Sequence, residues 1–295
     1  MLKNLSSVGT SLKSLTLCTN SLFGCKIHCS KMATRKLPCC ANLPFLFPEE
    51  GDLLSRFNAA SKCGFKAVEF PFPEELNAAD VAHSMKKNNL TVVMMNSSKS
   101  GSINGFAAIP GMEAQFLTSL NKSVEFCKAL NCSKLHVVAG VVEKPSVDHD
   151  QTYEKNIRMA VDICEKKGIT VLIEPISPTA LPNYYLNNFD RAVALIKKID
   201  NPFLKLQVDF FHLQIMKGNL ANNIKDWFPL IGHIQVAQVP DRNEPDTPGE
   251  INFQYIFDLL SELKYKEWIG FEYKPATAGN VAAGLGFLDK MDLTI

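Results

Sequence analysis

Residues 170–211, TVLIEPISPTALPNYYLNNFDRAVALIKKIDNPFLKLQVDFF, contain one complete unit of the pattern that decides the fold. The unit begins with a short apolar run at 170–173, continues with a helix-length segment at 188–199, and ends with a second apolar run at 204–211. Neither run alternates cleanly between apolar and polar residues, which is typical of strands buried on both faces. The unit therefore predicts a strand, a helix and a second strand parallel to the first.

The same alternation repeats eight times along the chain. The apolar runs cover residues 39–43, 67–70, 91–96, 134–139, 170–173, 204–211, 233–239 and 268–273. The helix-length segments cover residues 52–63, 77–88, 113–130, 153–167, 188–199, 220–230, 253–263 and 279–290. An open doubly wound sheet usually has a glycine-rich turn after its first strand, whereas residues 41–44 read ANLP. Eight units in about 250 residues instead predict an α/β protein with a single closed (β/α)8 TIM barrel, which we place over residues 37–295.

Composition narrows the functional classes. The 295 residues include 31 Lys and Arg against 30 Asp and Glu, for a formal net charge of +1, which argues against a polybasic nucleic-acid binder. No apolar run approaches the roughly 18 residues of a membrane span. Nine cysteines without zinc-finger spacing indicate a reducing compartment. We expect a small-molecule substrate, no nucleic acid and no membrane as partners, and we leave a homo-oligomer open.

Residues 1–36 differ from the rest of the chain and are predicted to form a disordered N-terminal extension. Residues 1–31 contain nine Ser and Thr, four Lys and no acidic residue, the composition of a mitochondrial targeting segment. The alternative is a shorter cytosolic form that starts at Met32. The segment lacks the continuous apolar region of a secretory signal, so we expect a cytoplasmic or mitochondrial protein that is not secreted.

Polar residues stand at the predicted ends of all eight strands, where a TIM barrel builds its active site. They are Asn42, Glu69, Asn96, His136, Glu174, Asp209, Gln235 and Glu272. Burying a lone carboxylate is costly, so any one of them could belong to a structural ion pair, the favoured interpretation for Glu69. Four oxygen-bearing side chains nevertheless fall on consecutive strands: Glu174, Asp209, Gln235 and Glu272. This set predicts a site for Mg²⁺ or Mn²⁺, because a divalent cation relieves the repulsion between neighbouring carboxylates.

Six motifs in the second half of the chain point to a family. They read EPISP at 174–178, QVDFFH at 207–212, GNL at 218–220, GHIQVAQVPDRNEP at 232–245, GEINF at 249–253 and WIGFEYKP at 268–275. These motifs resemble the hydroxypyruvate isomerase family of xylose-isomerase-like barrels. The resemblance implies reversible conversion of hydroxypyruvate to 2-hydroxy-3-oxopropanoate (tartronate semialdehyde), with Glu174 and Glu272 as the acid/base pair. It also implies assistance by a divalent metal and no organic cofactor.

Three further residues are candidates for substrate binding. His212 could hydrogen-bond a substrate oxygen, or simply pack against Phe211. Arg242 could hold the substrate carboxylate in a bidentate pair, or instead pair with Glu244 or Asp246. Lys274 lies two residues after Glu272, on the same predicted strand face, and is a second candidate for the carboxylate.

The chain departs from the family after the third strand. Family members often carry an arginine after the Pro-Gly of that loop, where this chain has Met112, and Lys99 is the only cation of residues 98–105. A sugar 3-epimerase of the same barrel class is an alternative, but that family uses histidine as the ligand on strand seven, where this chain has Gln235. A multi-zinc barrel nuclease is disfavoured by the near-zero charge. A non-catalytic small-molecule binder remains the other alternative, and it would not need both Glu174 and Glu272.

Overall fold

The computed structural model describes residues 36–99, 101 and 104–295. The proposed targeting segment, residues 1–31, lies outside the described residues. So does nearly all of the extension predicted over residues 1–36.

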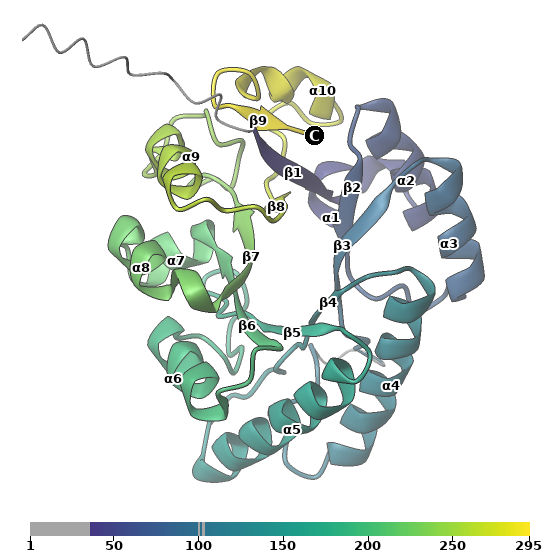
Figure 1. The fold of residues 1–295 in the computed structure, drawn as a ribbon, viewed down its shortest axis with the longest axis vertical. Helices are drawn as coiled ribbons and strands as arrows, with labels where there is room; N and C mark the ends of the chain where they lie inside the picture. Colours follow the sequence, from purple (N-terminus) through teal and green to yellow (C-terminus); the bar gives the residue numbers. More distant parts are fainter. Residues whose placement is uncertain (1–35, 100, 102–103) are drawn as a thin grey trace, which may run out of the picture. The chain divides into compact units, whose positions relative to one another are not determined.

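Eight parallel strands form a closed barrel with the helices outside it (Figure 1). The strands are β1 (Leu37–Asn42), β2 (Ala67–Phe70), β3 (Thr91–Asn96), β4 (Lys134–His136), β5 (Thr170–Ile173), β6 (Leu204–Asp209), β7 (Ile231–Val236) and β8 (Ile269–Phe271). Each strand pairs with the next, and β8 pairs with β1 at Cys39↔Ile269, which closes the ring. The predicted (β/α)8 TIM barrel is confirmed.

Helices follow the strands in alternation. They are α1 (Leu43–Leu46), α2 (Leu53–Lys62), α3 (Ala78–Lys87), α4 (Glu113–Ala129), α5 (Val147–Glu165), α6 (Phe189–Ile199), α7 (Phe210–Met216), α8 (Leu220–Trp227), α9 (Phe253–Glu262) and α10 (Val281–Gly284). The side chains of Asp52, Asn77 and Asn188 cap the first turns of α2, α3 and α6, which fixes where these helices begin. No helix in the described part of the chain is both long and apolar enough to cross a bilayer.

The sixth predicted strand, residues 204–211, is too long. β6 ends at Asp209, and α7 begins at Phe210. The reason is a cap, because Asp209 Oδ1 accepts a hydrogen bond from the backbone N–H of Phe211 at 2.9 Å. The chain therefore turns at the barrel mouth, and this turn places His212 close to Asp209.

Other boundaries also differ from the sequence prediction. β4 ends at His136 instead of residue 139, because Ser97 Oγ and Tyr184 Oη accept the N–H groups of Val138 and Ala139. α5 begins at Val147 instead of residue 153. Residues 279–290 contain only the short α10 and a 3₁₀ turn, η3 (Leu285–Phe287). The unpredicted β9 (Leu293–Thr294) pairs with β1.

Candidate active site

The eight polar residues predicted at strand ends do lie there. Asn42, Asn96, His136 and Asp209 are the last residues of their strands, while Glu174 and Glu272 directly follow β5 and β8. Glu69 and Gln235 are the last-but-one residues of β2 and β7. Strand register sets neighbours side by side, with Asn42 opposite Glu69 and Asp209 opposite Gln235. The polar residues therefore gather at one mouth of the barrel, as expected for parallel strands.

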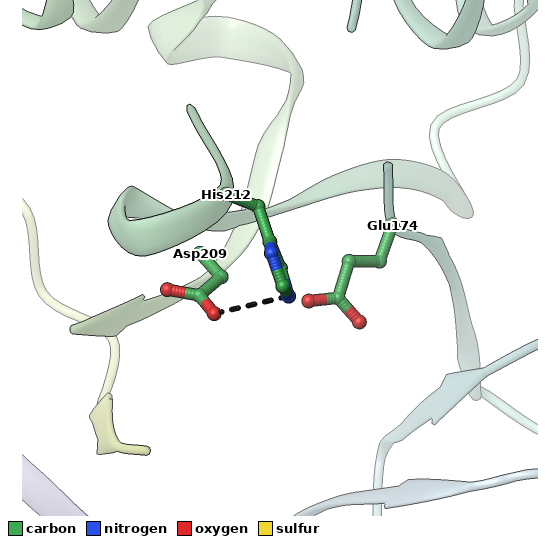
Figure 2. A group of neighbouring side chains, drawn as sticks. All are labelled: Glu174, Asp209 and His212. Atoms are coloured by element: carbon green, nitrogen blue, oxygen red, sulfur yellow. Dashed lines mark ion pairs between the residues drawn. The ribbon is translucent and has the colours of Figure 1, made fainter. Parts of the chain in front are cut away.

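A buried cluster of three side chains forms the centre of this mouth. One ligand atom each from Glu174, Asp209 and His212 lies within 4.8 Å of the others, and Figure 2 shows the three side chains converging. His212 Nε2 is 3.4 Å from Asp209 Oδ2, while its Nδ1 is 3.1 Å from Ser177 Oγ. Ser177 therefore orients the ring so that Nε2 faces the two carboxylates. Burial lowers the pKa of His212 to about 4, so the imidazole is neutral near pH 7, the form that binds a metal.

Arg242 lies between the carboxylate of Asp209, at the end of β6, and that of Glu272, which follows β8. Its Nη2 is 2.9 Å from Asp209 Oδ2 and 3.1 Å from Glu272 Oε2, and its Nε donates to the backbone oxygen of Glu272 at 3.2 Å. The guanidinium also lies 4.5 Å from the ring centre of Phe45 and 4.6 Å from that of Phe211. The guanidinium of Arg242 therefore already contacts two carboxylates, a backbone oxygen and two aromatic rings. Its partners are carboxylates of the site, whereas Glu244 accepts hydrogen bonds from the backbone N–H of Ala276.

Gln235 makes contacts that the sequence did not predict. Its Nε2 donates to Glu69 Oε1 at 2.6 Å, and its Oε1 accepts from Gln207 Nε2 at 2.7 Å. The metal ligands predicted from the sequence are Glu174, Asp209, Gln235 and Glu272. In the structure, the cluster of possible ligands joins Glu174 and Asp209 to His212 instead. Gln235 and Glu272 line the adjoining cavity.

Glu69 lies beneath this mouth and is completely buried. Its carboxylate contacts His233 Nε2 at 2.6 Å and accepts from Asn42 Nδ2 at 2.9 Å as well as from Gln235. Burial by itself raises the pKa of Glu69, but His233 and the amide donors outweigh burial and lower it overall. This is the structural pairing that was favoured for Glu69.

Glu174 and Glu272 have the opposite electrostatic setting. Burial raises the pKa of Glu174 well above its usual value, and the negative charge of Asp209 adds to this effect. Burial also raises the pKa of Glu272, although Arg242 opposes the shift. His136 Nδ1 lies 3.5 Å from Glu174 Oε2, and burial lowers the pKa of His136 to about 3. The raised pKa values favour the protonated form of both glutamates, a shift that is common among the acid/base groups of active sites.

A small cavity of about 210 Å³ has both Glu174 and Glu272 in its lining. Its polar lining consists of Asn42, Asn96, Lys99, Glu174, Gln207, Gln235 and Glu272. A wider recess of about 750 Å³ is lined by Arg242 and Lys274, among others. Lys274 is exposed there, so the structure places it outside the inner cavity. Gln207 and Lys99 were not predicted as site residues, although Gln207 precedes Asp209 by two positions and so shares its strand face.

The donor set fits a divalent cation. Two carboxylates and one imidazole offer oxygen and nitrogen ligands within reach of one centre, and a cation would offset the charge repulsion that raises the pKa of Glu174. In addition, Gln207 Oε1 is buried and has no hydrogen-bond partner among the residues that the structure describes. The structure thus provides a buried Glu, Asp and His group suited to a metal.

The chain matches known proteins over most of its length. Residues 57–291 match the family model of the xylose isomerase-like TIM barrel. The chain belongs to this family. A relative from Xenopus laevis, named putative hydroxypyruvate isomerase, is 41% identical over 261 residues, which cover 85% of this chain and 94% of the relative. A 2-oxo-tetronate isomerase from Cupriavidus necator is 38% identical over 256 residues, covering 84% of this chain and 96% of the relative.

Solved structures agree with this assignment. A protein from Brucella melitensis, described as an AP endonuclease of family 2, is 35% identical with a TM-score of 0.80, covering 86% of this chain and 98% of that one. The 3-keto-D-glucoside 4-epimerase from E. coli shares the fold at 20% identity, with a TM-score of 0.71 and coverage of 86% and 99%. The curated relatives are named isomerases, which confirms the expected enzyme class.

Proposed function

We propose that this isomerase interconverts hydroxypyruvate and 2-hydroxy-3-oxopropanoate, with Glu174 and Glu272 as the acid/base pair. The single observation that carries the proposal is that two glutamates of raised pKa, from β5 and β8, line one cavity of about 210 Å³. Ligand pockets commonly measure about 300–1,000 Å³, so this volume favours a short substrate. Relatives named for hydroxypyruvate and for 2-oxo-tetronate support a small 2-oxo acid.

The reaction moves one proton from C3 to C2 of hydroxypyruvate and another from the C3 oxygen to the C2 oxygen. It therefore needs a base beside the C–H bond and a group that exchanges a proton with the oxygens. Glu174 and Glu272 approach the cavity from different strands and can serve these two roles. Arg242 lies between Asp209 and Glu272 and fixes the position of the Glu272 carboxylate.

Glu174, Asp209 and His212 would hold a divalent cation, Mg²⁺ or Mn²⁺, with Gln235 and Glu272 as the additional ligands predicted from the sequence. When bound, the cation supplies positive charge that stabilises an enediolate. The proposal requires a small-molecule substrate and no other partner.

A substrate screen of the full chain tests the reaction. The protein is stripped with EDTA, supplied with Mn²⁺ or Mg²⁺, and offered hydroxypyruvate, 2-oxo-tetronate and neutral ketoses, with products identified by NMR. We expect turnover of hydroxypyruvate. Turnover of ketoses alone would favour the epimerase alternative, and no turnover of any compound would favour a non-catalytic binder.

Thermal unfolding tests the metal site without relying on activity. A ligand at 100 times its Kd stabilises the native state by about 2.7 kcal/mol, so Mn²⁺ should raise the Tm of the wild type. Asp209→Asn should abolish this rise, whereas Asp226→Asn, an exposed position on α8, should preserve it. An equal Mn²⁺ effect in both variants would contradict the assignment.

A further inference from the structure

The substrate of the proposed reaction carries a carboxylate, so the site needs a cation that reaches the cavity. Among the described residues, three cations line the inner cavity or the outer recess: Arg242, Lys274 and Lys99. The sequence favoured the first two. Their contacts in the structure differ sharply, and the difference identifies the third.

Arg242 has little capacity left for a second anion. It already pairs with Asp209 and Glu272 and donates to a backbone oxygen, and two phenyl rings lie against its guanidinium. Binding a substrate carboxylate bidentately would break pairs that neutralise buried charge, which is costly. Lys274 is exposed in the outer recess and does not line the cavity that contains Glu174 and Glu272.

Lys99 is the only cation among the described residues that line the inner cavity. Its ammonium donates to Asn104 Oδ1 at 3.0 Å, and it takes part in none of the ion pairs found within the described ranges. Glu74 is the acidic residue whose charge acts on it, but Glu74 Oε2 lies 3.0 Å from Lys122 Nζ. Two donor positions of the Lys99 ammonium are therefore available to an anion.

The backbone holds Lys99 in place. Its N–H donates to Glu74 Oε1 at 2.8 Å, which anchors the start of the loop after β3. The side chain is half-buried, and burial lowers its pKa. A carboxylate bound beside it would favour the charged ammonium, so the ligand and the protonated lysine would stabilise each other.

We infer that Lys99 binds the carboxylate of a short 2-oxo acid, directing the reacting carbons toward Glu174 and Glu272. This inference rests on the proposed function, since it names the residue that makes the site selective for an acid over a neutral ketose. The cavity supports this orientation, because Lys99 provides its positive charge and the two glutamates its acid/base groups.

Equilibrium binding of unreactive analogues tests the inference. Pyruvate carries the carboxylate, and pyruvamide replaces it with a neutral amide of similar size; both are titrated calorimetrically into the Mn²⁺-supplemented full chain. Lys99→Met should weaken pyruvate binding by about 10- to 100-fold, the value of a charge-assisted hydrogen bond, and leave pyruvamide binding unchanged. Lys99→Arg should retain most of the pyruvate affinity.

Lys166→Met is the matched control, because Lys166 is exposed at the end of α5. It should bind both analogues like the wild type. Loss of both analogues to the same extent in Lys99→Met would indicate a structural role and overturn the inference. So would unchanged pyruvate binding in Lys99→Met, or wild-type protein that prefers pyruvamide.

Binding separates this inference from the proposed reaction. Lys99-dependent binding of pyruvate without turnover of hydroxypyruvate would contradict the reaction and support the carboxylate site. Turnover of hydroxypyruvate with unchanged KM in Lys99→Met would support the reaction and contradict the carboxylate site at Lys99.

Discussion

Glu69 on β2 and the pair Glu174 and Glu272 after β5 and β8 are the same residue type at equivalent places in the barrel, yet their surroundings differ. Glu69 is fully buried, and its carboxylate contacts His233, Gln235 and Asn42. These partners lower its pKa despite burial. Glu174 and Glu272 have fewer compensating partners, and burial raises their pKa values. Position at a strand end therefore brings a carboxylate to the site, but the donors around it decide whether it can exchange protons.

The comparison indicates that Glu69 has a different role from Glu174 and Glu272. Glu69 holds the amide of Gln235, which in turn accepts from Gln207, so the ionised carboxylate fixes the orientation of both amides. Gln207 lines the cavity, and its side-chain oxygen accepts no hydrogen bond from the described part of the chain. Glu69 is in this sense a positioning residue, and Glu174 and Glu272 are the candidate catalytic residues.

The largest effect is expected from removing the acid/base groups. Glu174→Gln and Glu272→Gln should each lower kcat on hydroxypyruvate by about 10²–10⁴-fold, the usual value of general acid/base catalysis. Circular dichroism should show an intact fold. Glu262→Gln, exposed at the end of α9, is the matched control and should keep wild-type kcat. A kcat within tenfold of the wild type in either Glu174→Gln or Glu272→Gln would contradict this assignment.

Glu69→Gln should mainly affect stability. Three partners would lose a charged acceptor, and one hydrogen bond to a charged group is worth about 1.5–3 kcal/mol, so we expect unfolding in urea to require about 2–3 kcal/mol less free energy. The kcat should fall far less than in Glu174→Gln. A Glu69→Gln protein of unchanged stability but without activity would place Glu69 among the catalytic residues instead.

Gly270 tests how tightly Glu69 is held. A Cβ at this position of β8 would lie 2.5 Å from Glu69 Oε1, so Gly270→Ala must displace a carboxylate that several donors fix. Overpacking of this kind costs about 1–3 kcal/mol, measurable as a lower urea midpoint. Gly286→Ala, where a Cβ meets no atom within 4 Å, should leave the midpoint nearly unchanged. Equal midpoints for the two variants would show that Glu69 moves freely.

The smallest expected effect is a difference in how folding stability depends on pH, measured in protein without a divalent metal. The folded-state pKa of Glu69 is lowered from 4.5, so its contribution to stability is present above about pH 4.5 and is lost as pH falls through the folded value. The pKa of Glu272 is raised, so its contribution is present below about pH 4.5 and is lost as pH rises. The stability gap between wild type and Glu69→Gln should therefore shrink on acidification. The gap between wild type and Glu272→Gln should shrink as pH rises, and parallel trends would contradict the contrast.

The sequence predicted the barrel and the strand-end residues because both follow from periodicity and parallel strand direction. It did not predict that His212 would join Glu174 and Asp209, because that depends on Asp209 ending β6 and capping α7. The hydrogen bond between Glu69 and Gln235 crosses the barrel between residues far apart in the chain. No local pattern encodes such a contact.

The cations show the same limit. The sequence placed Arg242 and Lys274 near the mouth, but whether a cation is free depends on its tertiary partners. Arg242 is occupied by the carboxylates of the site, and Lys274 lies in the outer recess. The sequence shows Lys99 only as the cation of residues 98–105, because no local pattern indicates that its side chain lines the cavity.

Proton exchange between substrate and solvent tests the central claim most directly. Hydroxypyruvate is incubated in D₂O with wild type, Glu174→Gln, Glu272→Gln or Glu69→Gln, and deuterium incorporation at C3 is followed by NMR. We expect incorporation with the wild type and Glu69→Gln, and a loss of at least 100-fold in at least one of the other two variants. Normal incorporation with both Glu174→Gln and Glu272→Gln, alongside its loss in a folded Glu69→Gln protein, would contradict the account.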